Sequence, residues 1–186
     1  MNKRELIDYV CQNLETTKAG AEEMCVAYTN TYKLPILISH TMNVFGERQH
    51  PEKFIPNCIQ KVRDGEKVEI HSDVTKKIAG SRHYIHANDV ADGCLFLIKN
   101  KQKLSKTETD FGGAKCPKFN LVGPVELDNL KLAELVSKSV GKKLKYEMVD
   151  FHTSRPGHDL RYALSGELMK KVGWVPKVSI EQRIDQ

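Results

Sequence analysis

"LPILIS", residues 34–39, is the stretch that decides the fold class. It is short, almost wholly apolar and opened by a proline, which is typical of a strand buried on both faces of a parallel sheet. Upstream of it, apolar and aromatic residues recur at helical spacing from Ala21 to Tyr32, which predicts a helix that leads into the strand. A helix followed by a buried strand favours an α/β fold.

The segments downstream continue this mixture of strands and helices. "VEIHS" (68–72) and "HYIH" (83–86) alternate apolar and polar residues, which predicts two half-exposed, hairpin-like strands. Asn88 is expected to cap a helix, and Asp128 to open another that ends at Gly141. Further strands are expected at 119–123 and 143–149, a last helix at 165–172, and a solvated loop in the lysine-rich segment 99–118.

Length and composition limit the class of protein. With 186 residues the chain is long enough for one domain with a real core, and 40% hydrophobic and 28% charged residues fit a globular chain. No apolar run approaches the roughly 20 residues that cross a bilayer, and the charged start is no secretory leader. We therefore expect one domain over residues 1–186, cytoplasmic, without a membrane partner.

The charge balance points to small anions as ligands. A net charge of +5 allows binding of phosphates, but the chain shows no basic stripe and no motif with interleaved aromatics, which argues against nucleic acid. The cysteines are odd in number, scattered and never spaced as C-x-x-C, which argues against disulfides and zinc and favours buried reduced thiols; they are Cys11, Cys25, Cys58, Cys94 and Cys116.

Three turns carry positive side chains that suit an anion. "HPEKFIP" (50–56) holds Lys53 in a proline-bounded turn, "GSRHYIH" (80–86) holds Arg82, and "SRPGHDLRY" (154–162) concentrates Arg155, His158 and Arg161. Arginine forks match phosphate because two donors meet two oxygens at fixed geometry. Each arginine alone would more often be a solvated or structural ion-pair residue, so the hypothesis depends on their convergence.

Familiar catalytic motifs are missing from the sequence. It has no G-x-S-x-G, no cysteine–histidine nucleophile pattern and no G-x-G-x-x-G between a strand and a helix. His83 and His86 lie three apart on an expected strand, so they face opposite sides and cannot share a metal. We expect no metal site.

Seven collinear segments nevertheless resemble one family, the NAD-dependent nucleotide-sugar 4,6-dehydratases, which are extended short-chain dehydrogenases typified by the dTDP-glucose 4,6-dehydratases. The resemblance runs from about Thr17 to Ile184 and is to the C-terminal part of those enzymes. The segments are "TTKAGAEE", "TYKLPILISHTMNVFG", "HPEKFIP", "GSRHYIHANDVA", "FNLVG", "SRPGHDLRYALS" and "VGWVPKVSIEQRI". The resemblance implies the last strands of a Rossmann-type sheet with a smaller α/β substrate-binding lobe.

The resemblance also assigns roles to residues. Lys18 matches the lysine of the family's Tyr-x-x-x-Lys motif, which holds the nicotinamide ribose and lowers the pKa of the tyrosine; it could equally be a surface helix residue here. The remaining matches are to positions that contact the nucleotide sugar, with Arg82 in the place of a pyrophosphate-binding arginine. These positions are Asn43, Lys53, His71, Arg82, Asn120, Arg155 and His158.

Departures from the pattern shape the functional hypothesis. Leu14 stands four residues before Lys18, where the family needs tyrosine, and leucine has no ionisable group to assist hydride transfer. The family's dinucleotide-binding units would lie upstream of Met1. We therefore expect a truncated relative that keeps a nucleoside diphosphate sugar site, is inactive by itself and does not bind NAD alone.

Two alternatives stay open at this stage. A Rossmann-type partner chain could complete an active dehydratase or epimerase, supplying NAD and the missing base. The chain could instead be a structural protein that assembles as a homo-oligomer, such as a dimer, through the helix that contains Lys18.

Overall fold

The computed structural model describes residues 18–105, 116–150 and 159–185, and these form two compact units. The first comprises residues 1–39 and 97–119, and the second residues 40–96 and 120–186. Within the described part of the chain, no helix is long and apolar enough to cross a bilayer.

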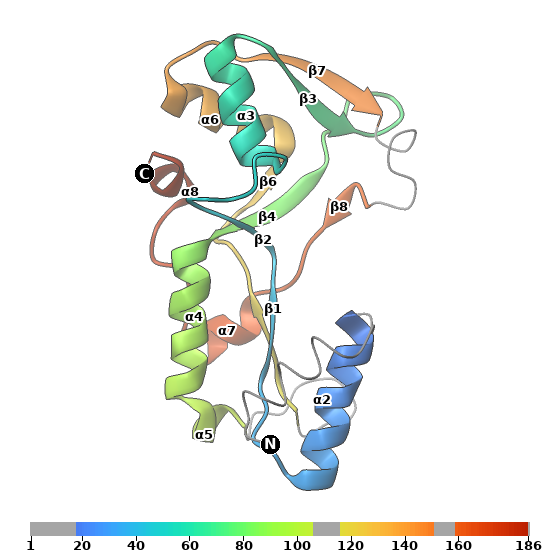
Figure 1. The fold of residues 1–186 in the computed structure, drawn as a ribbon, viewed down its shortest axis with the longest axis vertical. Coiled ribbons are helices and arrows are strands. Elements are labelled where there is room, and N and C mark those ends of the chain that lie inside the picture. Colours follow the sequence, from blue (N-terminus) through green and yellow to red (C-terminus); the bar gives the residue numbers. More distant parts are fainter. Residues whose placement is uncertain (1–17, 106–115, 151–158, 186) are drawn as a thin grey trace. The chain divides into compact units, whose positions relative to one another are not determined.

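The elements alternate between helices and strands (Figure 1). The helices are α2 (Lys18–Tyr32), α3 (Phe54–Asp64), α4 (Ala87–Lys99), α5 (Lys101–Leu104), α6 (Asn129–Val140), α7 (Glu167–Lys171) and α8 (Ile180–Ile184). The strands are β1 (Ile38–Thr41), β2 (Asn43–Phe45), β3 (Lys67–Ser72), β4 (Ser81–His86), β5 (Lys118–Leu121), β6 (Glu126–Asp128), β7 (Lys145–Asp150) and β8 (Arg161–Tyr162).

Most of the strand pairs are parallel, as the α/β prediction requires. β2 and β8 both pair with β4 in parallel, β3 pairs with β7 in parallel, and β6 joins β4 in antiparallel orientation. β1 pairs with β5. The α/β prediction with parallel strands is confirmed.

An apolar core of the second unit lies where α3 and α6 pack on the β3–β7 sheet (Figure 1). Helix α3 forms because Ile55, Cys58 and Val62 recur at helical spacing and are all buried. It ends at Gly65, whose φ of 71° is the left-handed conformation that glycine adopts at low cost. Asp128 caps α6 by accepting a hydrogen bond from the Lys131 amide, and Gly141 ends it, both as predicted.

Buried polar pairs tie the C-terminal helices to α4. Arg183 of α8 donates through Nη2 to Asp89 Oδ1 at 2.7 Å and through Nε to Asp89 Oδ2 at 3.2 Å. Trp174 Nε1 donates to Asp92 Oδ2 at 2.9 Å. Asp89 lies in the segment "GSRHYIHANDVA", and Trp174 and Arg183 lie in "VGWVPKVSIEQRI", so the packing of α4 with the C-terminal residues joins these two segments.

Several sequence predictions were wrong in detail. The run 34–39 is strand only from Ile38, and its side chains are half-buried or exposed. The strands 67–72 and 81–86 are not a hairpin, since they belong to different sheets. Strand β4 does not alternate either: its last three residues, which pair with β2, are all buried.

Two helix predictions also need correction. Helix α4 begins at Ala87, and the ring of His86, not Asn88, accepts a first-turn amide, with Nδ1 at 3.2 Å from the Asn88 nitrogen. Helix α3 was missed altogether. In the segment expected as a loop, residues 101–104 form α5, which buries Leu104. Of the described cysteines, Cys58 and Cys116 are buried, whereas Cys25 and Cys94 are only partly so.

Candidate functional site

A pocket of about 320 Å³ opens in the second unit where β2 and β4 meet the start of α3. This volume is at the lower end of the range for small-molecule sites, so it fits part of a large ligand. Its walls combine apolar side chains with a few polar ones: Asn43, Val44, Phe45, Gln49, Lys53, Phe54, Ile55 and Tyr84.

The pocket is suited to a negative charge because it lies at the N-terminus of a helix. Lys53 is the residue before α3 and is exposed, with an extended backbone. Its ammonium group is an exposed donor at this end of the helix, where it can reach a ligand. The amides of Phe54 and Ile55 stand in the first turn, where no carbonyl of the helix can accept from them. Helix dipole, two amides and one ammonium group therefore act at the same wall.

Tyr84 forms the floor of this pocket as a neutral phenol. Its ring is buried and its hydroxyl donates to Asn129 Oδ1 at 2.7 Å. Burial raises the pKa of Tyr84 to about 12, although the charge of Arg82 and a hydrogen bond from Asn43 act in the opposite direction. A phenol with this pKa is a poor base at neutral pH, so the pocket can bind and orient a ligand but offers no phenolate from Tyr84.

Gln49 holds the turn that follows β2. The sequence alone did not indicate this role. Its Nε2 donates to the Val44 carbonyl at 2.7 Å. Among the described residues its buried Oε1 has no hydrogen-bond partner. The sequence signal was its place between the "TMNVFG" and "HPEKFIP" segments.

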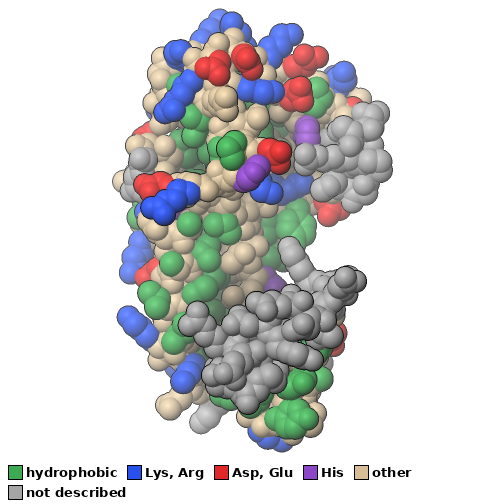
Figure 2. Space-filling model, viewed as in Figure 1, with side chains coloured by type: hydrophobic (Ala, Val, Ile, Leu, Met, Phe, Trp, Pro, Cys, Tyr) green, Lys and Arg blue, Asp and Glu red, His purple; other side chains and the backbone are tan. Residues whose placement is uncertain are grey.

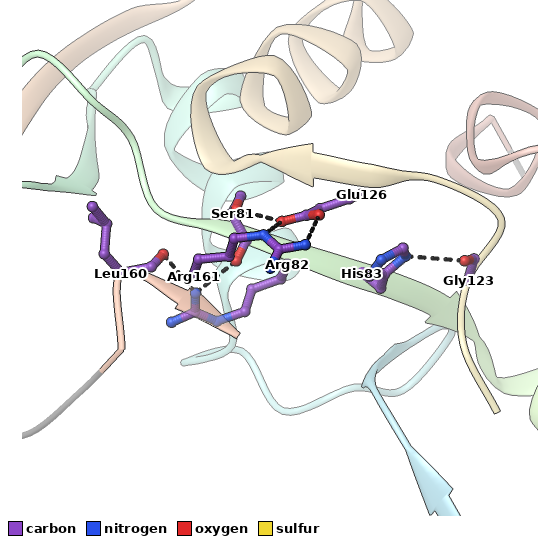
Figure 3. Close-up of polar contacts among 7 residues, drawn as sticks. All are labelled: Ser81, Arg82, His83, Gly123, Glu126, Leu160 and Arg161. Carbon is purple, nitrogen blue, oxygen red and sulfur yellow. Dashed lines mark hydrogen bonds and ion pairs between the residues drawn. The ribbon is translucent and has the colours of Figure 1, made fainter. Parts of the chain in front are cut away.

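Arg82 lies beside the pocket but is bonded to backbone. Its Nη1 donates to the carbonyls of Ser81 at 2.6 Å and Leu160 at 2.8 Å, and its Nη2 donates to the carbonyl of Asp159 (Figure 3). Arg161 is also engaged, through a two-point ion pair with Glu126. Lys53 lines the pocket, whereas Arg82 is not among its lining residues and serves backbone carbonyls.

Positive charge in this region acts locally. On the face shown in Figure 2, Lys and Arg side chains are interspersed with Asp and Glu over the described surface. This face therefore carries no extended field of one sign over its described surface.

Comparisons with known proteins identify the family of the chain. The model of the family described as "NAD dependent epimerase/dehydratase family" matches residues 14–110. The chain belongs to this family.

Individual relatives of the family support the same assignment. The chain is 36% identical over 91% of its length to a low-salt glycan biosynthesis protein, Agl12, of Haloferax volcanii, covering 49% of that protein. It is 28% identical to human dTDP-D-glucose 4,6-dehydratase, again over 91% of this chain and 45% of the relative. The chain thus spans about half the length of the curated relatives it matches.

A solved structure shows the same fold. The dTDP-glucose 4,6-dehydratase of Bacillus anthracis, in complex with NAD, matches with a TM-score of 0.70 at 28% identity. The match covers 90% of this chain and 48% of that one. The described α/β fold is therefore that of about half of a family dehydratase.

Of the other residues that the family resemblance singled out, the described ones lie on two strands and one helix. His71 lies on β3, half-buried. Asn120 on β5 is hydrogen-bonded on both sides of its amide: Nδ2 donates to the Ser165 carbonyl at 2.9 Å, and Oδ1 lies 3.3 Å from His40 Nδ1. The first residue of α2 is Lys18. Lys18's side chain, Leu14, Arg155 and His158 lie outside the described residues.

His40 is a further residue that sequence reasoning missed. Because the Asn120 amide donates to Ser165, its oxygen faces His40, and the ring nitrogen Nδ1 must donate to it. His40 thereby fixes which way Asn120 presents its amide. The only signal in the sequence was the position of His40 inside the "TYKLPILISHTMNVFG" segment.

Proposed function

We propose that this chain binds a nucleoside diphosphate sugar, with the diphosphate at the wall formed by Lys53 and the first turn of α3. The observation that carries this proposal is the pocket itself, in which a helix N-terminus, an ammonium group and the Asn43 amide meet. Charge-assisted hydrogen bonds of this kind are the strong ones for phosphate oxygens. The dehydratase names of the relatives support a nucleotide sugar as the ligand class.

In this proposal the remaining pocket residues orient the ligand. The apolar rings of Phe45 and Phe54 give it a water-poor wall, and Asn43 presents an amide next to Tyr84. The volume of about 320 Å³ holds the diphosphate and one ring, so the rest of the ligand extends beyond the described pocket.

We further propose that the chain does not run the dehydration by itself. Leu14 stands where a family tyrosine is expected, and Tyr84 is held neutral by burial. The described residues also do not fit NAD: among them, no strand leads through a G-x-G-x-x-G turn into a helix that could seat a pyrophosphate. The homo-oligomer and the Rossmann-type partner chain remain predictions.

Calorimetric titration of the full chain with dTDP-glucose and UDP-glucose tests the proposal. We expect saturable binding of at least one of them, and Lys53→Gln should weaken it about threefold to tenfold, because one charge-assisted contact of an exposed ammonium is lost. Lys177→Gln, which changes an exposed lysine of the same unit outside the pocket, is the matched control and should bind like the wild type.

Two results would contradict the proposal. One is the absence of heat with both nucleotide sugars at millimolar concentration. The other is equal affinity of the Lys53 and Lys177 variants.

The proposal that the chain does not dehydrate the sugar by itself needs a separate test, in which NAD is added and 4,6-dehydration is followed. Turnover by the chain alone would show that catalysis does not depend on a tyrosine at position 14.

A further inference from the structure

Two side chains of the pocket stand next to each other on neighbouring strands. Asn43 of β2 and Tyr84 of β4 are direct partners in the parallel register, and both line the pocket. Tyr84 accepts a hydrogen bond from the Asn43 side chain. Asn43 is exposed, whereas Tyr84 is buried. The phenol is therefore the fixed partner of the pair, and the Asn43 amide is the one that a ligand can reach.

The hydroxyl of Tyr84 decides which end of the Asn43 amide faces it. A phenol has one hydrogen on its oxygen, and Tyr84 gives this hydrogen to Asn129 Oδ1 at 2.7 Å. The oxygen of Tyr84 can then only accept, so Asn43 must turn an N–H toward it. The hydrogen bonds thus run in one direction, from Asn43 through Tyr84 to Asn129.

An amide that is held by its nitrogen offers its oxygen to other groups. The Asn43 oxygen is an acceptor, so it requires a ligand group with a hydrogen to donate. Phosphate groups supply acceptor oxygens, and these suit Lys53 and the first turn of α3 instead. In a nucleoside diphosphate sugar, the hydroxyls of the sugar are the donors attached next to the diphosphate.

We propose that Tyr84 is a positioning residue, which turns the Asn43 amide so that its oxygen accepts a hydrogen bond from a sugar hydroxyl of the ligand. The inference rests on the proposed function and divides the pocket into two parts. The Lys53 side takes the diphosphate, and the Asn43 side takes the sugar. Tyr84 then favours UDP-glucose over UDP without contacting the phosphates.

Removal of one hydroxyl tests this role by calorimetric titration of the full chain with UDP-glucose and with UDP. Tyr84→Phe should weaken UDP-glucose binding about threefold to tenfold, the value of one hydrogen bond, and UDP binding less than about twofold. Tyr146→Phe is the matched control, since Tyr146 on β7 is 47% exposed and lies outside the pocket. The control should leave both affinities unchanged.

Further variants separate positioning from a general effect on the fold, with the ratio of UDP-glucose affinity to UDP affinity as the readout. Asn43→Ala should lower this ratio, and adding Tyr84→Phe to it should bring no further loss, because both changes act through one amide. Asn129→Asp keeps an acceptor for the Tyr84 hydroxyl and should retain the ratio. Asn129→Ala should lower it, because the hydroxyl can then donate to Asn43. The Asn129 pair keeps the test decisive if Tyr84→Phe does not fold.

Three outcomes would overturn the inference while leaving the proposed function intact. One is a wild-type chain that binds UDP as tightly as UDP-glucose. Another is an equal loss of both affinities in Tyr84→Phe, since Asn43 would then serve a part that the two ligands share. The third is a Tyr84→Phe variant that keeps the wild-type ratio.

A result without any ligand binding is also decisive. If the wild-type chain binds neither UDP nor UDP-glucose, the proposed function fails, and the sugar contact fails with it. The ¹⁵N and ¹H resonances of the Asn43 side-chain amide in the ligand-free chain then test the positioning role by itself. Tyr84→Phe should shift these resonances, and unchanged resonances would show that Tyr84 does not hold this amide.

Discussion

The two sides of the second unit are held together in different ways. Around β3, helices α3 and α6 pack through aliphatic side chains that are almost completely buried, such as Ile70, Leu132 and Val136. Along β4 the neighbouring strands are short, and polar side chains take over: Arg82, Arg161, Ser81 and Glu126 form a network at the surface.

This difference indicates which side of the unit supplies most of its stability. Burial of aliphatic groups is non-directional and sums to a large free energy, so the β3 side supplies the rigid frame. Polar groups at the β4 side gain little net stability while exposed. The largest effects on stability are therefore expected from changes in the frame.

Truncation in the apolar frame should have the largest effect. Leu132 is fully buried between α6 and the β3–β7 sheet, so Leu132→Ala should lower the free energy of unfolding by about 3–5 kcal/mol through lost transfer energy and a cavity. Urea denaturation measures it. Leu95→Ala, at a side chain on α4 that is 53% exposed, should change stability by less than about 0.5 kcal/mol.

The contrast fails if both variants lose similar stability. It also fails if Leu132→Ala abolishes nucleotide binding under conditions where the chain remains folded. The apolar core would then affect binding directly, and its role could not be separated from that of the pocket.

Breaking the buried ion pair should have the next largest effect. Asp89→Asn removes the carboxylate that faces the Arg183 guanidinium, whose side chain is only 13% exposed. We expect a loss of about 3 kcal/mol, because removing one partner of a buried ion pair is costly. Glu134→Gln, on the exposed face of α6, is the control and should stay within about 0.5 kcal/mol of wild type. A neutral effect of Asp89→Asn would mean that water reaches Arg183.

The smallest effect on stability is expected at His86, the last residue of β4. Burial lowers the pKa of His86 below its ordinary 6.5, and the nearby Arg183 acts in the same direction. The folded state then binds fewer protons than the unfolded one, so its stability is complete above pH 6.5 and falls as pH drops through 6.5 toward the lowered pKa. Protonation also removes the acceptor that caps Asn88.

Thermal unfolding of wild type and His86→Asn from about pH 8 to about pH 5 measures this dependence, and we expect a contribution below about 1 kcal/mol that the variant lacks. His50→Gln, at an exposed histidine, should keep the wild-type profile. Identical pH profiles of the wild type and His86→Asn would refute the assignment.

Much of the frame was predictable because its signals are local. Gly141 and Asp128 bound α6 as their cap chemistry indicates. Helix α3 had a signal of the same kind, with Ile55, Cys58 and Val62 at helical spacing before Gly65, but Pro51 and Pro56 made the segment resemble a turn. Proline is tolerated in the first turn of a helix, and this possibility was overlooked.

The site was only partly predictable, because hydrogen bonds between residues far apart in the chain produce no periodic pattern in the sequence. The sequence indicated that Arg82 and Lys53 are suited to phosphate, but not that Arg82 would donate to the carbonyls of residues 77 and 78 positions later in the chain. Nor could it show that burial would keep Tyr84 neutral. Such features depend on tertiary neighbours.

One measurement tests the central claim most directly: a map of backbone amide chemical shifts in the ¹⁵N-labelled full chain during titration with UDP-glucose. The account predicts saturable shifts that are largest at Phe54 and Ile55, in the first turn of α3, and small at Arg63 and Asp64 in its last turn. Saturable binding with shifts confined to residues outside the pocket would contradict it, as would no shifts at all.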